Sequence, residues 1–229
     1  MTRIAIIPAR GGSKRIPKKN IKSFLGKPII AYTIEAALQS QLFDKVIVST
    51  DNEEIAIIAR FYGAEVPVLR SNKNSDDHAV LADVILEVLL FYKNKKITFD
   101  KICCLLPTAP FVTSKSLKTS YNKLKNEKLD AVFPVLEFSF PIQRSLEVLE
   151  NKIHMVWEEY MNSRSQDLEK RYHDAGQYYW LKTTSFLEEK KLFMKNSGAI
   201  IISELEAQDI DTETDWKLAE LKYKLLKHE

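Results

Sequence analysis

A basic stretch with paired glycines near the start of the chain has the residue types that bind phosphate groups. An apolar run, residues 4–8, leads into Gly11 and Gly12, and six basic residues fall between positions 10 and 22. No acidic residue occurs before Glu35. Glycines let backbone N–H groups approach phosphate oxygens, and cations neutralise the remaining charge. The stretch therefore predicts a site for a nucleoside triphosphate or a sugar phosphate.

This stretch follows neither of the two common phosphate-binding patterns. It is not G-x-x-x-x-G-K-[ST] and it is not G-x-G-x-x-G, so the mechanics of those loops do not carry over. A solvated basic loop with turn glycines is the structural alternative. Six cations without an intervening acid favour the ligand site.

An acidic cluster near the end of the chain has the spacing of a metal-binding pair. Asp209 and Asp211 are two residues apart, so in extended chain their carboxylates point the same way and can share one divalent cation. The alternative is a helix start, with Thr212 as N-cap and Asp215 three residues on. We apply that alternative to Glu213 and Asp215, and favour metal binding for the earlier pair. Mg²⁺ typically takes one or two carboxylates together with substrate phosphates.

A phosphate loop and a metal-binding pair in one chain predict nucleotidyl transfer. The metal would bridge phosphate oxygens and orient an attacking hydroxyl, while the cations stabilise the charge that gathers on the pyrophosphate leaving group. This chemistry needs neither a Cys-His pair nor a Ser-His-Asp triad.

Apolar runs alternate with segments of helical periodicity over the first 135 residues. Strands are expected at residues 4–8, 45–50, 64–69, 101–106 and 131–135. Helices are expected at residues 29–39, 53–62, 79–92 and 115–125. The alternation predicts an α/β fold with a Rossmann-like, mainly parallel sheet flanked by helices. Ligands of such sheets bind at the carboxyl ends of the strands, which is where residues 10–20 fall.

The alternation stops after residue 135. Residues 137–172 are polar, with a hairpin expected at Glu150 and Asn151, and we interpret them as an inserted arm. Strand patterns return at residues 176–181 and 199–203, and an amphipathic helix is expected at 213–227. We expect one domain, residues 1–229, with a protruding arm at 137–172.

Composition and charge limit which binding partners and which cellular compartment we expect for this protein. The 229 residues suit a single domain, and a net charge of +3 is too small to indicate a nucleic acid partner. Cys103 and Cys104 are adjacent, point to opposite faces of a strand and are expected to be reduced core residues. The apolar runs are too short to span a bilayer and the N-terminus does not have the pattern of a signal peptide, so we expect a cytoplasmic protein without a membrane partner.

Four motifs, in order, resemble those of the acylneuraminate cytidylyltransferase family, the CMP-sugar synthetases. Residues 9–20 match the family pattern A-R-x-x-S-K-x-x-P-x-K-N, and residues 49–51 match S-T-D. Residues 107–110 match P-T-[AS]-P and residues 209–213 match D-I-D-T-E. The resemblance runs from residue 4 to about residue 220.

The resemblance implies CTP as donor, Mg²⁺ as cofactor, a nonulosonic acid as acceptor, and CMP-sugar with pyrophosphate as products. It implies a fold of the nucleotide-diphospho-sugar transferase type and a homodimer whose arm closes the partner's sugar pocket. The nucleotide-binding residues that it implies are Ala9, Arg10, Gly11, Gly12, Ser13, Lys14, Lys19, Asn20 and, near the cytosine, Arg70. The catalytic residues that it implies are Arg10, Lys19, Asp209 and Asp211, the last two as metal ligands.

The acceptor is expected to be pseudaminic acid. The sialic acid branch has glutamine where Leu106 stands, and P-N-G-A-I-Y where residues 174–180 stand. Residues 138–144 and 162–168 are instead similar to those of pseudaminic acid cytidylyltransferases, which favours this acid over sialic, legionaminic or ketodeoxyoctonic acid. The candidate sugar-binding residues are Gln143, Arg144, Arg164, Gln166, Asp174, Gln177 and Tyr178. The two arginines also fit solvated rim charges, and the tyrosine also fits a core residue.

Two rival functions remain from the residues. Another sugar nucleotidyltransferase would use a sugar phosphate, but such enzymes usually show G-x-G-T-R-x-x-P, which this chain lacks. A catalytically inactive nucleotide-binding module would not need Asp209 and Asp211, so their retention argues for an enzyme.

Overall fold

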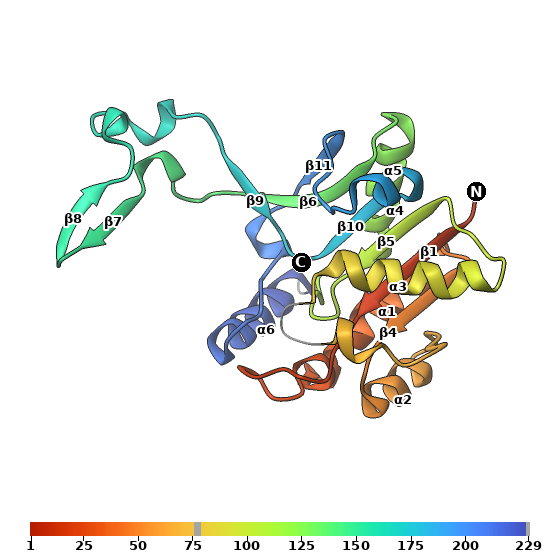
Figure 1. Cartoon of the computed structure of the whole chain (residues 1–229). Helices are drawn as coiled ribbons and strands as arrows, with labels where there is room; N and C mark the ends of the chain where they lie inside the picture. The colour runs from red at the N-terminus through yellow and green to blue at the C-terminus, as the bar shows by residue number, and fades with distance from the viewer. Residues whose placement is uncertain (76–78, 228–229) are drawn as a thin grey trace.

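The computed structural model describes residues 1–75 and 79–227 and contains, within them, a seven-stranded central sheet (Figure 1). The strand order is β11-β6-β10-β5-β1-β4, and β9 pairs with β6 beside this path. The strands are β1 (Arg3–Pro8), β4 (Lys45–Ser49), β5 (Lys101–Leu105), β6 (Ala131–Glu137), β9 (Tyr172–Asp174), β10 (Tyr178–Lys182) and β11 (Ser197–Ile201).

The sheet is mixed but mostly parallel, as the alternation of strands and helices predicts. β1 pairs in parallel with β4 and with β5, and β11 pairs in parallel with β6. β10 is antiparallel to both of its neighbours, and β9 is antiparallel to β6. Both antiparallel strands come after the projecting segment in the sequence, and the alternation of strands and helices ends before that segment.

Helices cover both faces of the sheet. Their bounds are α1 (Ile29–Ser40), α2 (Glu53–Phe61), α3 (Leu81–Asn94), α4 (Ser114–Asn126), α5 (Thr183–Glu189) and α6 (Glu213–Lys227). Along β1, Ala5 and Ile7 pack with α1, α2 and α4, whereas Ile4 and Ile6 pack with α3 and α5. Alternate residues of one strand therefore supply both layers of the core.

The adjacent cysteines follow the same rule. Cys103 lies in the core beneath α1 and α4, and Cys104 lies in the core beneath α3. Both thiols are buried and free, as expected. In the part of the chain that the structure describes, no helix has the length and apolar character to cross a membrane.

The strand expected at residues 64–69 does not form. Glu65 makes a single parallel bridge to Ile47, with its N–H on the carbonyl of Val46 at 2.8 Å and its own carbonyl on the N–H of Val48 at 2.9 Å. The next donor in this ladder would be residue 67, which is a proline without an N–H. The ladder therefore ends after one bridge.

A further apolar cluster joins the basic stretch to the last helix. It contains Ile16, Phe24, Ile29, Tyr32, Phe111, Ile210, Trp216 and Ala219. Phe24 belongs to a small hairpin of β2 (Ser23–Phe24) and β3 (Lys27–Pro28), and its ring meets those of Tyr32 and Trp216 edge-on. Ile16 and Ile210 are each 1% exposed, so the basic and the acidic segment are anchored in the same cluster.

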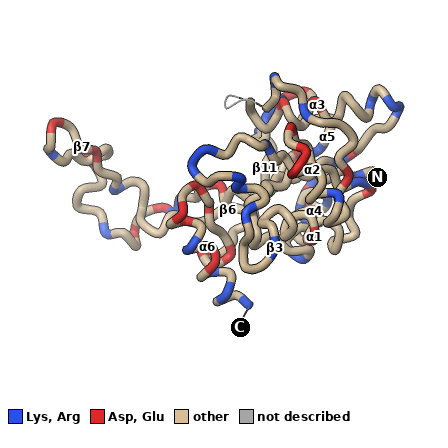
Figure 2. The backbone as a smooth tube through the Cα atoms, turned by 90° about the horizontal axis from the view of Figure 1, so that it is seen from below, with Lys and Arg blue, Asp and Glu red and all other residues tan. Residues whose placement is uncertain are grey.

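The chain between β6 and β9 projects away from the sheet (Figure 1 and Figure 2). Its outer part is the expected hairpin, formed by β7 (Leu146–Leu149) and β8 (Lys152–Met155). Glu150 and Asn151 connect the strands with φ angles of 49° and 61°, the positive values that a tight two-residue hairpin turn requires. The rest of this segment contains the single 3-10 turns Ile142–Arg144, Glu158–Tyr160 and Ser165–Asp167.

Candidate nucleotide and metal site

The basic loop, residues 9–22, lies at the carboxyl end of β1 and is held on two sides. The N–H of Gly11 donates to Asp51 Oδ1 at 2.8 Å, and the side chain of Asn20 donates to the carbonyl of Arg10 at 2.9 Å. Asn20 is buried, and the N–H of Ala9 donates to the carbonyl of Ser49 at 2.9 Å. The loop is thus fixed before any ligand arrives. Ala9, which is fully buried, offers only its backbone.

The two glycines of the loop have different roles. A Cβ atom at Gly11 would lie 3.0 Å from Cβ of Asn52, whose side chain caps α2 by accepting from the N–H of Ile55 at 3.1 Å. A Cβ atom at Gly12 would meet no described atom within 4 Å. Gly11 therefore allows close packing against α2, and Gly12 faces open space.

A cleft of about 380 Å³ opens beside this loop. Its lining residues are Pro8, Arg10, Ser13, Lys14, Arg15, Ile16, Lys19, Asn20, Leu106, Pro107 and Thr108. A neighbouring hollow of about 220 Å³ is lined by Pro8, Arg10, Arg70, Asn74, Ala79, Leu81 and Val84. Because Pro8 and Arg10 line both, the two spaces adjoin. Together they reach from Lys19 to Arg70, and their size suits a small-molecule ligand.

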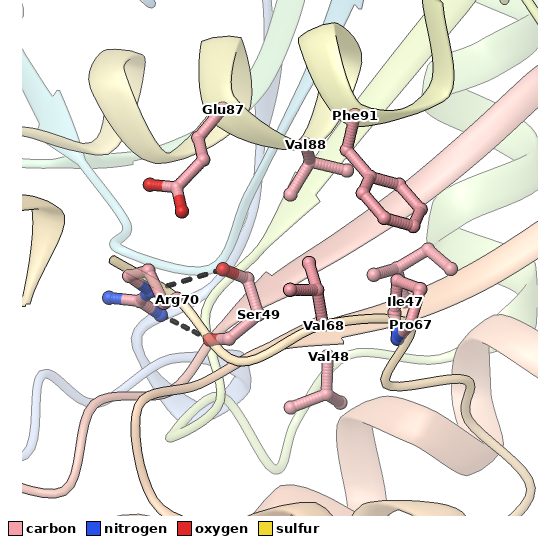
Figure 3. Close-up of a pocket in the computed structure, with 9 residues that line it drawn as sticks. All are labelled: Ile47, Val48, Ser49, Pro67, Val68, Arg70, Glu87, Val88 and Phe91. Atoms are coloured by element: carbon pink, nitrogen blue, oxygen red, sulfur yellow. Dashed lines mark hydrogen bonds between the residues drawn. The ribbon is translucent and has the colours of Figure 1, made fainter. Parts of the chain in front are cut away.

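Arg70 is buried and borders both the second hollow and the small gap that Figure 3 shows. Its Nε donates to Ser49 Oγ at 3.0 Å, its Nη2 donates to the carbonyl of Ser49, and its Nη1 lies 3.4 Å from the carbonyl of Asn74. Burial lowers the pKa of Arg70 and the nearby Asp51 opposes this, so the guanidinium remains charged. The narrow gap of about 20 Å³ between Arg70 and Phe91 is lined mainly by apolar atoms and is too small for a nucleotide.

The basic loop and the acidic segment meet at Lys19. Its ammonium donates to the carbonyl of Ile210 at 2.6 Å and lies 3.4 Å from Asp211 Oδ1. Arg15 Nη2 is 2.9 Å from the same carboxylate oxygen. Two charged segments that are about 190 residues apart in sequence therefore meet beside the cleft, which Arg15 and Lys19 line and the two aspartates do not.

Asp209 and Asp211 form a pair of interacting carboxylates. Partial burial, and then repulsion from Asp211, raise the pKa of Asp209, while Lys19 acts in the opposite direction. A divalent cation between two such groups would relieve this repulsion, and an oxygen-only donor set suits Mg²⁺. Among residues 1–75 and 79–227, no group of three or more His, Cys, Asp or Glu side chains is arranged to hold a metal.

Of the two acids that follow this pair, Asp215 caps α6, as expected. Asp215 Oδ2 accepts from the N–H of Thr212 at 2.7 Å and from its hydroxyl at 2.8 Å, and Thr212 Oγ1 accepts from the N–H of Asp215 at 3.3 Å. Hydrogen bonds from Thr212 lower the pKa of Asp215. Glu213 pairs with Lys22 at 2.6 Å. The helix cap thus involves Thr212 and Asp215, whereas Asp209 and Asp211 precede the helix.

Four candidate sugar-binding residues lie on the projecting segment. Arg144 is 3.5 Å from Ser165 Oγ, Arg164 pairs with Asp167 at 2.7 Å, and Gln166 is exposed. Gln143 is buried, and its amide donates to the carbonyl of Glu169 at 2.8 Å. Within the described residues, none of these side chains lines the two hollows beside the basic loop.

The other three candidates lie on the body of the protein. Asp174 accepts from the N–H of Gly176 at 3.1 Å and from the hydroxyl of Tyr179, and the amide of Gln177 donates to the carbonyl of Glu206 at 2.6 Å. Tyr178 is fully buried, with its hydroxyl 2.7 Å from that of Ser120. Burial raises the pKa of Tyr178 to about 12. Its burial fits the alternative given for Tyr178 from the sequence, a core residue.

Several residues of the site were not singled out from the sequence. Arg15 contacts Asp211, Asp51 holds Gly11, and Thr108 lines the cleft. Arg15 stands in the basic run and Asp51 in the S-T-D motif, so both had a signal in the sequence. Asn74, which lines the second hollow, had none.

Comparisons with known proteins identify the family of the chain and several relatives. Residues 4–224 match the family model described as cytidylyltransferase. The chain is 42% identical over 226 residues to the pseudaminic acid cytidylyltransferase of Campylobacter jejuni subsp. jejuni serotype O:2, covering 98% of this chain and 97% of the relative. It is 32% identical over 223 residues to the CMP-N,N'-diacetyllegionaminic acid synthase of Legionella pneumophila, covering 95% of this chain and 94% of that relative.

A solved structure shares the fold. The CMP:2-keto-3-deoxy-manno-octonic acid synthetase complexed with CTP superimposes with a TM-score of 0.71 at 17% identity, covering 100% of both chains. At this identity the likeness concerns the fold alone. The family model and the sequence relatives, which span nearly the whole chain, show that the protein belongs to the cytidylyltransferase family.

Proposed function

We propose that this protein transfers CMP from CTP to the anomeric hydroxyl of a nonulosonic acid, pseudaminic acid, with release of pyrophosphate. The observation that carries the proposal is the contact of Lys19 with Ile210 and Asp211, which brings the carboxylate pair beside the cleft that the cationic loop lines. The relative that is 42% identical over nearly the full length supports pseudaminic acid as the acceptor.

The cationic side of the cleft suits the triphosphate of CTP. Arg10, Ser13, Lys14 and Lys19 line it, and the hydrogen bonds of Gly11 and Asn20 hold the loop that carries them. When the bond between the α-phosphorus and the bridging oxygen breaks, negative charge gathers on the leaving pyrophosphate. Cations placed there in advance stabilise that charge more than they stabilise the ground state.

The carboxylate side suits a magnesium ion. Asp209 and Asp211 would hold it, together with phosphate oxygens of the substrate. Bound Mg²⁺ would offset phosphate charge and help to align the acceptor hydroxyl with the α-phosphorus. Asp211 also orients Arg15 and Lys19 from the same edge, so the carboxylate links the two halves of the site.

The projecting segment suits an interface with a second copy of the chain. Val148 and Ile153 are directly opposite each other on β7 and β8, and each is 68% exposed. Leu146 lies on the same face of the hairpin and is also exposed. A two-stranded ribbon with an uncovered apolar face is marginally stable alone, and such a face marks an association surface. We propose a homodimer in which Arg144, Arg164 and Gln166 approach the partner's sugar site.

A panel of acceptors tests the proposed reaction. The purified protein is incubated with CTP and Mg²⁺ and with pseudaminic, legionaminic, sialic or ketodeoxyoctonic acid, and the CMP-sugar is followed by mass. We expect the highest kcat/KM with pseudaminic acid, and loss of turnover when EDTA removes the metal. A higher kcat/KM with another acid would overturn the assigned acceptor, and CTP binding without turnover on any acid would favour a nucleotide sensor.

A further inference from the structure

Glu87 on α3 holds a short segment that borders the second hollow. Its Oε1 accepts from the N–H of Ser71 at 2.8 Å, and its Oε2 accepts from the hydroxyl of Ser71 at 3.0 Å and from the side-chain amide of Asn74. Asn72–Asn74 is a single 3-10 turn without a buried residue, so these bonds are its main tether to α3. In Figure 3 the carboxylate of Glu87 points from α3 toward Arg70.

The charge of Glu87 determines how the amide of Asn74 is oriented. Partial burial acts to raise the pKa of Glu87, but the hydrogen bonds from Ser71 and Asn74 and the charge of Arg70 lower it overall. The side chain is therefore an ionised carboxylate, which can only accept hydrogen bonds. It must face the NH₂ group of Asn74, because two facing oxygens would repel. The oxygen of the same side-chain amide therefore points away from Glu87.

An acceptor oxygen held in this way can distinguish the two pyrimidines. Asn74 and Arg70 both line the second hollow, and Nη1 of Arg70 lies 3.4 Å from the backbone carbonyl of Asn74. Cytosine carries an amino group, a donor, at position 4, where uracil carries a carbonyl oxygen, an acceptor. A fixed carbonyl oxygen attracts the amino group and repels the carbonyl group.

We propose that the amide oxygen of Asn74 selects the 4-amino group of cytosine and that Glu87 is the positioning residue that fixes this amide. The inference rests on the proposed function only in so far as the hollow receives a pyrimidine nucleotide. It assigns base selection to the 71–74 segment and to α3, in addition to the arginine that borders the same hollow.

Two substitutions test the inference through the ratio of kcat/KM for CTP to kcat/KM for UTP. Asn74→Ala removes the acceptor, so we expect the ratio to fall about tenfold, mainly through a higher KM for CTP. Glu87→Gln can donate as well as accept and no longer forces one amide orientation, so CTP should weaken and UTP should improve. Inhibition by inorganic tripolyphosphate, which has no base, should be unchanged in both variants.

The control is Glu127→Gln, which removes a carboxylate that pairs with Lys123 at 3.1 Å on α4, and which should leave the ratio unchanged. Calorimetric titration with CTP and with UTP, without an acceptor, gives the corresponding ratio of dissociation constants even if the acceptor assay fails. An unchanged ratio in Asn74→Ala, with native thermal melting, overturns the inference. Equal weakening of CTP and UTP in Glu87→Gln assigns that residue a purely structural role and also overturns it. Should Glu87→Gln fail to fold, Asn74→Ala alone decides.

Discussion

At the scale of single residues, Lys19 connects the two charged segments of the site. Its side chain is 21% exposed, and its ammonium donates to the carbonyl of Ile210 in the acidic segment. We expect Lys19→Ala to raise the dissociation constant of CTP about tenfold or more, because a charge-assisted hydrogen bond to phosphate is lost. The affinity for CMP should change little. Equal losses for the two nucleotides, measured by calorimetry, would contradict a role at the β- and γ-phosphates.

Asp211 is the carboxylate on which the basic residues converge. Arg15 and Lys19 both lie within ion-pair distance of its Oδ1. We expect Asp211→Asn to lower kcat about 100-fold or more, while CTP affinity stays within a modest factor, because the role is concentrated in the transition state. Steady-state kinetics with Mg²⁺ measure this. A variant that keeps most of its kcat would show that Asp211 is not a metal ligand.

At the scale of elements, one buried isoleucine in each charged segment holds the segments together. Ile16 stands among the cations and Ile210 between the two aspartates, and both belong to the cluster that includes Trp216. We expect Ile210→Ala to lower the free energy of unfolding by about 2–4 kcal/mol and to reduce kcat, because a cavity forms beneath the carboxylates. Urea denaturation and kinetics check this.

The matched control for this prediction is Ile57→Ala on α2. Ile57 is 59% exposed, so the same truncation there should change stability by less than about 0.5 kcal/mol. If Ile210→Ala proved as harmless as the control, the shared cluster would not be what positions the acidic segment.

Asp130 ties the start of β6 to three other parts of the fold. It accepts from Ser185 Oγ at 2.6 Å and from Asn196 at 3.1 Å, and it lies 3.3 Å from the ammonium of Lys182. The hydrogen bond from Ser185 is the main reason that the pKa of Asp130 is lowered. Because the folded-state pKa lies below the unfolded one, this stabilisation is complete above the unfolded-state pKa and is lost as pH falls through the folded-state pKa.

The resulting prediction concerns acid sensitivity. Asp130→Asn should be less stable than the native chain at neutral pH. The difference should begin to shrink below about pH 4, where the carboxylate of the unfolded chain protonates, and should vanish at the lower pH where the folded carboxylate protonates. Urea midpoints over a pH series measure it. A difference that stays constant down to the most acidic point would show that ionisation of Asp130 does not matter.

At the scale of the whole molecule, the hairpin of β7 and β8 projects from the sheet, and its apolar face is exposed to solvent. We expect the native protein to sediment as a dimer and Val148→Asp to sediment as a monomer. The aspartate would stand opposite Ile153, and dimer formation would bury its charge without a counter-ion. The variant should also have a higher KM for the sugar and an unchanged affinity for CTP. Glu147→Ala, on the polar face of β7, is the control and should remain dimeric. A dimer that survives Val148→Asp would place the interface elsewhere.

The sequence by itself determined the features that depend on neighbouring residues. The continuous apolar run at residues 4–8 predicts a buried strand, which forms as β1, and Thr212 with Asp215 predicts the start of α6. Paired turn residues predict the hairpin at Glu150 and Asn151. Motifs that are contiguous in the chain were enough to indicate the cytidylyltransferase family, which the family model and the relatives confirm.

Only the tertiary structure decided which distant residues meet and which are buried. Pro67 ends a ladder whose partner is β4, and Tyr178 is buried because α4 covers it. The orientation of Asn74 depends on Glu87, which the chain brings back on the next helix. The meeting of Lys19 with Ile210 follows from the burial of one isoleucine from each segment in a single cluster. Such burial depends on how remote parts of the chain pack together, and a local pattern of residues does not specify that packing.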